Sequence, residues 1–269
     1  MVAKVVLTGL AGLLLLASCA FVADDEACCT RTAELEAQSD RRPAQLERFP
    51  SPLGSLALAS PAAASLPAPS RWTHHTLPGK KSTRYAYEWL DHRPTMRAQA
   101  VSSASMLRYA LRAEAAALGH IKFSWKVPKL IAGADLTQRD AHDSPVRVAL
   151  AFDGDRALFS AKDAMLSELA HAVGGEPLPY ATLIYVWCSQ CERGALLKSP
   201  RTDRIREMVL ESGPDKLGQW QDYRRDIRAD FELAFGEAPG ALLSVGLMTD
   251  TDNTGESTSA WYGPISLTQ

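Results

Sequence analysis

Two cysteines, Cys188 and Cys191, are separated by two residues in the segment WCSQC, directly after an apolar run. Such a pair can exchange disulfides, because one thiolate attacks a partner and the second thiol resolves the mixed disulfide. That chemistry needs a helix beginning at the first cysteine, whereas Gly194 and Pro200 leave room for a short helix at best. We favour a local disulfide in an oxidising compartment, with thiol redox chemistry and unpaired thiols as alternatives.

Oxygen-bearing side chains cluster in the segment MTDTDNTGE, at Asp250, Asp252, Asn253 and Glu256. The D-x-D-x-x-G spacing resembles the start of an EF-hand loop, but the twelfth position, which must supply a bidentate carboxylate, is Trp261. Three interpretations stay open: a calcium site of another geometry, a turn whose side chains bond the backbone, and a loop that contacts a ligand.

Aromatic rings that could stack on sugars are scattered along the chain, at Trp72, Trp89, Trp125, Trp187, Trp220, Trp261 and Tyr262. Most tryptophans in small domains lie in the core, and we expect Trp89 to be the most exposed. The sequence lacks a G-x-S-x-G, a phosphate-binding glycine loop and an H-E-x-x-H. Asp153 and Asp155 could serve glycoside hydrolysis, but an Asp-Gly turn explains them without catalysis.

The N-terminus predicts export. Lys4 precedes the apolar run 5–16, which is shorter than the roughly 20 residues that span a bilayer, as in a secretory signal peptide. Residues 16–19, LASC, resemble the bacterial lipoprotein box, which implies cleavage before Cys19 and its lipidation as a membrane anchor. Ala20 resembles the sorting residue of outer-membrane lipoproteins facing the periplasm. A soluble periplasmic protein is the alternative, and Cys28 and Cys29 receive no role.

Composition separates a tether from a domain. Residues 51–70 carry four prolines and no charge, which favours an extended linker. We therefore expect a signal peptide and lipoprotein box over 1–19, a largely disordered tether over 20–70 and one domain over 71–269. With 29 basic and 31 acidic residues, the chain lacks the excess of positive charge that is typical of proteins that bind nucleic acid.

Within the domain, alternating or continuous apolar segments predict strands at 123–127, 146–152, 182–187, 205–209, 242–248 and 259–267. Strands at short intervals, separated by Gly, Pro and Asp, indicate a mostly β, antiparallel sandwich. We expect the 146–152 strand to be half-buried, with Arg147, Ala149 and Ala151 on its other face.

Helices are fewer, and we expect one or two short ones. Ser160 and Asp163 resemble a capping box before a helix that ends at Gly174-Gly175 and has Met165, Leu166, Leu169 and Val173 on one face. A four-residue spacing predicts a second helix, ending at Gly236, through Tyr223, Ile227, Phe231 and Phe235. The composition of residues 103–118 favours helix without deciding it.

Several segments together resemble the bacterial family named domain of unknown function 3047. They are residues 77–85, 103–105, 123–127, 147–152, 185–187, 225–236 and 248–255. The resemblance implies a jelly-roll β-sandwich similar to carbohydrate-binding modules, and it favours strand over residues 103–111. It implies no established activity and no catalytic residue.

These observations lead to the hypothesis of a lipid-anchored, non-catalytic binding domain of the cell envelope, for glycan or another envelope ligand. An enzyme is the alternative, either a thiol oxidoreductase using Cys188 and Cys191 or a glycan-active hydrolase. A third interpretation is a scaffold that binds an envelope protein.

Overall fold

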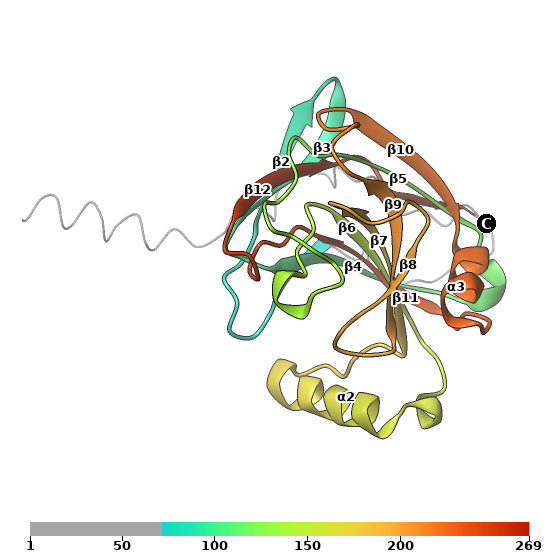
Figure 1. The fold of residues 1–269 in the computed structure, drawn as a ribbon. Helices are drawn as coiled ribbons and strands as arrows, with labels where there is room; N and C mark the ends of the chain where they lie inside the picture. The colour runs from blue at the N-terminus through green and yellow to red at the C-terminus, as the bar shows by residue number, and fades with distance from the viewer. Residues whose placement is uncertain (1–71, 269) are drawn as a thin grey trace, which may run out of the picture. The chain divides into compact units, whose positions relative to one another are not determined.

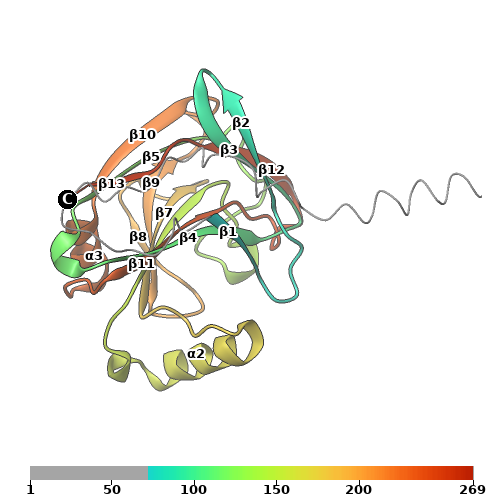
Figure 2. The ribbon, with the colours of Figure 1, turned by 180° about the vertical axis from the view of Figure 1, so that it is seen from behind.

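The computed structural model describes residues 72–268, in which two β-sheets pack face to face (Figures 1 and 2). Every described element belongs to the compact unit Pro50–Gln269. The signal peptide, the tether, Cys19, Cys28 and Cys29 lie outside the described residues. No helix in the described part of the chain is long and apolar enough to cross a membrane.

The larger sheet, sheet A, has seven strands in the order β1-β4-β11-β6-β7-β9-β8. Their bounds are β1 Trp72–Thr76, β4 Ser105–Ala113, β6 Arg147–Phe152, β7 Ala181–Cys188, β8 Leu196–Lys198, β9 Ile205–Ser212 and β11 Leu242–Met248. Strands from both ends of the sequence thus lie side by side, since β11 pairs with both β4 and β6.

The smaller sheet, sheet B, has the order β10-β5-β12-β3-β2, and β13 also pairs with β5. Its strands are β2 Arg84–Leu90, β3 Arg93–Val101, β5 His120–Lys126, β10 Trp220–Asp226, β12 Ser257–Tyr262 and β13 Ser266–Thr268. All six predicted strand segments are present. The segment 259–267 forms parts of two strands, β12 and β13, on either side of the break at residues 263–265.

One pair departs from the predicted antiparallel pattern. β7 and β9 run parallel, because the short edge strand β8 turns the chain back before β9 pairs with β7. The expectation of a half-buried β6 was also wrong, since all six of its residues are buried. The segment between β5 and β6 covers part of the outer face of sheet A, where its His142 accepts from Arg147 of β6 and its Leu136 packs with Val186 of β7 and Val209 of β9.

The helices are α2 Ala161–Gly174 and α3 Ile227–Phe235, with short 3₁₀ turns η1 Ala115–Ala117, η2 Arg139–Ala141 and η3 Arg156–Leu158. Ser160 caps α2 by accepting the Asp163 N–H at 3.1 Å, as the capping box predicts. Tyr223 lies in β10 and not in the second helix, because Asp226 caps α3 through the Ala229 N–H. Residues 105–113 form β4, so the strand expectation was correct.

Helix α2 turns its polar side to the protein. Asp163 and Ser167 are buried, and the Thr202 hydroxyl donates to Asp163 at 2.5 Å. Three of the four residues of the predicted apolar face instead meet solvent, with Met165 64%, Leu169 57% and Val173 60% exposed, and Leu166 is half-buried. Hydrogen bonds from buried polar side chains therefore attach the helix more than its apolar stripe does.

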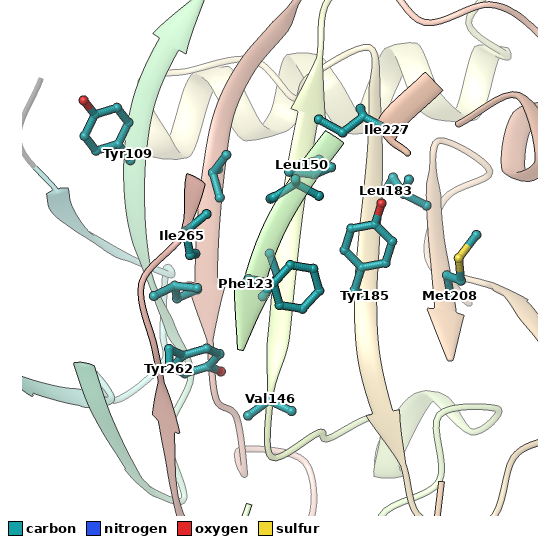
Figure 3. Packing of buried hydrophobic residues seen from close by; sticks show 14 of the residues in the cluster. Tyr109, Phe123, Val146, Leu150, Leu183, Tyr185, Met208, Ile227, Tyr262 and Ile265 are labelled. Atoms are coloured by element: carbon teal, nitrogen blue, oxygen red, sulfur yellow. The ribbon is translucent and has the colours of Figure 1, made fainter. Parts of the chain in front are cut away.

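The core lies between the two sheets (Figure 3). Phe123 of sheet B stacks on Tyr185 of sheet A, with ring centroids 5.4 Å apart, and Trp125 and Tyr223 extend the cluster. Burying each such side chain contributes about 2 kcal/mol to the free energy of folding. This core fixes the alternation of sheet B, so side chains not facing it must point outward.

Candidate functional site

The acidic loop between β11 and β12 holds the four residues singled out in the sequence. Asp250 is buried and accepts from the Ser144 N–H at 3.1 Å and from Arg147 Nε at 3.0 Å. Asp252 pairs with Lys80 at 2.5 Å. Both carboxylates are largely enclosed, and they differ in their counter-charge: Asp250 pairs with the buried Arg147, and Asp252 pairs with the partly exposed Lys80.

The other two residues have different surroundings. The Asn253 N–H donates to Asp143 at 3.2 Å, and its amide donates to the Arg139 carbonyl at 2.9 Å. Glu256 is exposed, and its hydrogen bonds within residues 72–268 involve only its backbone, one of them from the Ser102 N–H. Asn253 thus anchors the loop, whereas Glu256 lies apart from the other acids.

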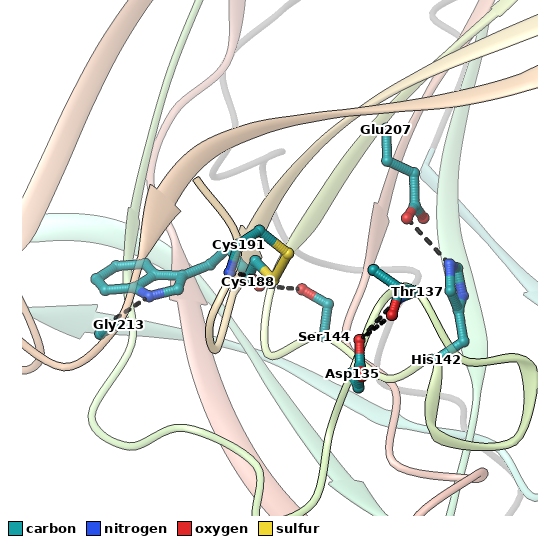
Figure 4. Close-up of a disulfide and its surroundings, with 9 residues drawn as sticks. Asp135, Thr137, His142, Ser144, Cys188, Cys191, Glu207 and Gly213 are labelled. Atoms are coloured by element: carbon teal, nitrogen blue, oxygen red, sulfur yellow. Dashed lines mark hydrogen bonds and ion pairs between the residues drawn. A yellow bond between two sulfur atoms is a disulfide. The ribbon is translucent and has the colours of Figure 1, made fainter. Parts of the chain in front are cut away.

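A buried charge network, which the sequence did not indicate, underlies this loop. Arg147 contacts Asp250 on one side and Glu207 on the other, and it donates to the His142 carbonyl at 2.9 Å. His142 Nε2 lies 3.0 Å from the second oxygen of Glu207 (Figure 4). The alternation of β6 placed Arg147 towards solvent, and nothing in the sequence marks its distant partners.

Burial raises the pKa of both carboxyl groups, Asp250 and Glu207, and attraction to Arg147 lowers it. Burial raises the pKa of Asp250 to about 6, although attraction to Arg147 opposes this rise. Burial also disfavours the charged form of Glu207, but attraction to Arg147 and hydrogen bonding from His142 outweigh it and lower its pKa. The network therefore holds Glu207 ionised while Asp250 titrates nearer to neutral pH.

Asp143, Asp250 and Asp252 offer carboxylate oxygens within 4.8 Å of one another, a cluster of the kind that can hold a calcium ion. Calcium requires six to eight oxygen ligands. Here Asp143 already accepts from the Thr254 N–H and hydroxyl, and the Lys80 ammonium already pairs with Asp252. A calcium ion would have to displace Lys80, so the donor set fits the metal poorly.

Cys188 and Cys191 form a disulfide at the end of β7, with Cα atoms 5.6 Å apart (Figure 4). Turn residues follow, and the next element is the strand β8. The bridge borders a hollow of about 320 Å³, which Asp135 and Glu192 also line. Because no helix begins at Cys188, a thiolate there would lack the helix N-terminus that stabilises the attacking cysteine of thioredoxin-like sites.

A different feature covers the outer face of sheet B, where Trp220 and Trp261 flank Lys126 in adjacent strands. Each indole N–H donates to a carboxylate, that of Trp220 to Asp91 at 3.0 Å and that of Trp261 to Glu88 at 2.5 Å. We call this surface the aromatic face. It comprises Glu88, Asp91, Arg93, Arg97, Lys126, Trp220, Asp222 and Trp261.

Cations complete the aromatic face. The Arg93 guanidinium lies 5.0 Å from the ring centroid of Trp220, and that of Arg97 lies 5.8 Å from the ring centroid of Trp261. Arg93 also binds both carboxylate oxygens of Asp222, at 2.7 and 3.3 Å. Both rings are half-buried, so they are held in fixed orientations and still reach solvent.

A hollow of about 410 Å³ continues from the aromatic face along β5 and β10. Its lining includes Arg93, Lys122, Ser124 and Asp222. Gly263 lies beside it, and a Cβ there would stand 2.1 Å from the Ser124 hydroxyl and 3.7 Å from the Trp220 ring. The missing side chain lets both groups approach the backbone.

The remaining tryptophans are arranged differently. Trp89 is the most exposed, at 67%, as predicted, and it lies on the opposite side of β2 from Glu88. Trp125 and Trp187 are core residues, and Trp72 packs edge-on against Tyr109. The sequence offered no signal that would select Trp220 and Trp261, because only the strand register brings them together.

The two packed sheets define a jelly-roll β-sandwich protein. The chain belongs to the family described as protein of unknown function (DUF3047), whose model matches residues 70–266. This confirms the family resemblance. No curated protein matches the chain in sequence.

Solved structures of similar architecture come from several organisms. One is a cellulase derived from Cel12A of Rhodothermus marinus, with 12% identity and a TM-score of 0.39 over 73% of this chain and 95% of that one. Another is the family 11 carbohydrate-binding module of the cellulosomal cellulase Lic26A-Cel5E of Clostridium thermocellum, at 10% and 0.36 over 79% and 93%. A third is the xyloglucanase domain of NopAA from Sinorhizobium fredii, at 8% and 0.37 over 76% and 99%. No functional conclusion follows from likenesses at this level.

Proposed function

We propose that this protein is a non-catalytic glycan-binding domain of the bacterial cell envelope, held at the outer membrane by lipid at Cys19, with its ligand on the aromatic face. The observation that carries the proposal is the pair of Trp220 and Trp261, oriented by carboxylates on the outside of a sheet. The apolar side of a sugar ring stacks on such rings, while its hydroxyls bond to neighbouring charged groups.

The acids of this face favour binding over hydrolysis. Asp91 accepts from Lys126 and Trp220, Glu88 from Trp261, and Asp222 from Arg93. The hydrogen bond from Lys126 lowers the pKa of Asp91, whereas a general acid needs a raised pKa. These carboxylates therefore orient rings and accept hydrogen bonds.

Binding to a broad polysaccharide panel tests the proposal. Residues 70–269 contain every described element and both hydrophobic clusters, so this fragment keeps the described contacts. We expect selective retention that Trp261→Ala or Trp220→Ala weakens by about tenfold, the loss of one stacked ring.

Trp89→Ala is the matched control, since it removes an exposed ring that lies off the aromatic face. It should bind like the wild type, and circular dichroism should show that all variants fold. Unchanged retention in both aromatic-face variants would refute this location for the site. No retention of any polysaccharide by the wild type would refute glycan binding.

The anchor has a separate test. A Cys19→Ser variant of the full chain, expressed in a Gram-negative host, should leave the membrane fraction and appear in the soluble periplasmic fraction. If the variant still partitions with membranes, lipidation at Cys19 is not what anchors the protein.

A further inference from the structure

We propose that the glycan is anionic and that Lys122 and Arg224 bind its negatively charged group, an inference that rests on the glycan-binding function proposed above. These two residues are direct cross-strand partners on β5 and β10. Both side chains are exposed on the outer face of sheet B. Like charges placed directly opposite each other destabilise a sheet, so the arrangement is costly unless an anion joins them.

Neither cation has a partner in the part of the chain that the structure describes. Between residues 72 and 268, no hydrogen bond or ion pair involves the side chain of Lys122 or Arg224. Arg93 and Lys126, which lie nearby on the same face, differ, because Arg93 pairs with Asp222 and Lys126 pairs with Asp91. Lys122 and Arg224 therefore form a local excess of positive charge.

The acids on either side of Arg224 are engaged elsewhere. Asp222 is bound by both guanidinium nitrogens of Arg93. Asp226 caps α3 by accepting from the Ala229 N–H, and its other oxygen lies 4.0 Å from His120. Among the described contacts neither carboxylate binds Lys122 or Arg224, whereas a ligand oxyanion could bind both cations with charge-assisted hydrogen bonds.

The pair lies at the far end of the hollow from the two tryptophans. Lys122 lines the hollow, and Lys126, which the tryptophans flank, is four residues along the same strand. At about 3.3 Å per residue this separation is about 13 Å. Ser124 and the Arg93–Asp222 pair lie between the two ends. One short oligosaccharide could then stack on a ring and place its anionic group at the cations.

Matched acidic and neutral polymers test the inference. The probes are polygalacturonate and its fully methyl-esterified form for a carboxylate, and phosphomannan and unphosphorylated mannan for a phosphate. We expect residues 70–269 to bind the charged polymer of at least one pair more tightly than its neutral counterpart, with an affinity that falls as the salt concentration rises. The pair that shows this preference identifies the oxyanion as a carboxylate or a phosphate.

The double variant Lys122→Gln/Arg224→Gln should bind the charged polymer about tenfold more weakly and the neutral polymer as before. The matched control is Lys162→Gln/Arg201→Gln, which removes the same charge from α2 and the β8–β9 turn, where both residues are exposed. It should leave both affinities unchanged.

Three results would overturn the inference: no preference for either charged polymer, an unchanged double variant, or an equal loss in the control. Trp261→Ala separates it from the proposed function. If the wild type binds neutral polymers through Trp261 without any charge preference, only the inference fails. If no polymer of the panel binds, the proposed function fails and the inference fails with it.

Discussion

Replacing Arg147 with methionine tests whether the buried charge network stabilises the fold. Methionine keeps much of the volume but removes the cation that lies between Asp250 and Glu207. Both carboxylates are buried. The variant therefore leaves two acids inside the protein without their principal counter-charge.

The expected loss follows from the cost of breaking a buried ion pair, about 3–5 kcal/mol. For a domain of this size, each kcal/mol lowers the melting temperature by about 2–4 °C, so the midpoint should fall by roughly 10 °C. Without attraction to Arg147, we expect burial to hold the folded-state pKa values of both acids above their unfolded values. Protonation then favours the folded state, so the deficit should be greatest near pH 7 and shrink towards pH 5.

Urea unfolding of residues 70–269, followed by tryptophan fluorescence, measures this loss at several pH values. The control is the triple variant Arg147→Met/Glu207→Gln/Asp250→Asn, whose neutral side chains need no counter-charge and should recover much of the stability. A loss below about 1 kcal/mol at pH 7, or a deficit that does not change with pH, would refute the reasoning.

Four further predictions concern other parts of the structure. Because burial raises the pKa of Asp250 to about 6, the folded state holds a proton that the unfolded state releases, and the free energy of unfolding should fall as pH rises from about 4 to about 6. Asp250→Asn should remove this fall from the urea midpoints measured across that pH range, and an unchanged pH dependence would contradict the prediction. Gly240→Ala places a Cβ 2.1 Å from the Asp153 carbonyl oxygen and should lower the free energy of unfolding by about 1–3 kcal/mol. Gly174→Ala is the control, because its Cβ has nothing within 4 Å and should not destabilise α2. Equal melting temperatures of the two variants would count against the close approach at Gly240. Calcium should leave the wild-type melting temperature within about 1 °C of its value with a chelator, because Lys80 already neutralises Asp252; a clear rise in the wild type would restore the calcium interpretation. Cys188→Ser removes a disulfide that closes a loop of only a few residues, so the free energy of unfolding should fall by no more than about 2 kcal/mol. Polysaccharide retention should stay unchanged, and a loss of retention would give the disulfide a role in binding.

The sheets were largely predictable because strand signals are local. Each predicted strand segment forms at least part of a strand in the structure, and the caps at Ser160 and Gly175 bound α2 as expected. Two errors share one cause, since periodicity says which residues share a face but not what covers that face. The apolar side of α2 is exposed, and the alternate residues of β6 are buried.

The candidate site was less predictable because its partners are far apart in sequence. The pattern at 250–256 showed a polar loop, but not that Asp143, Lys80 and Arg147 would surround it. The aromatic face was equally hard to predict, because its residues also come from distant parts of the sequence. Trp220 and Trp261 become neighbours of Lys126 only through the pairing of β5 with β10 and β12, which no single segment encodes.

The position of β11 between β4 and β6 has a consequence for how the chain acquires its structure. Until residues 242–248 have arrived, neither β4 nor β6 has its shared neighbour, and the apolar residues of β6 and β7 have no complete sheet to join. β12 closes sheet B in the same way, by pairing with β3 and β5. Long-range pairing of this kind slows folding, because distant segments must meet before contacts repay the lost chain entropy. The domain should therefore fold only after its last strands are present, and losing the final 30 residues should leave a chain prone to aggregation rather than a smaller folded domain.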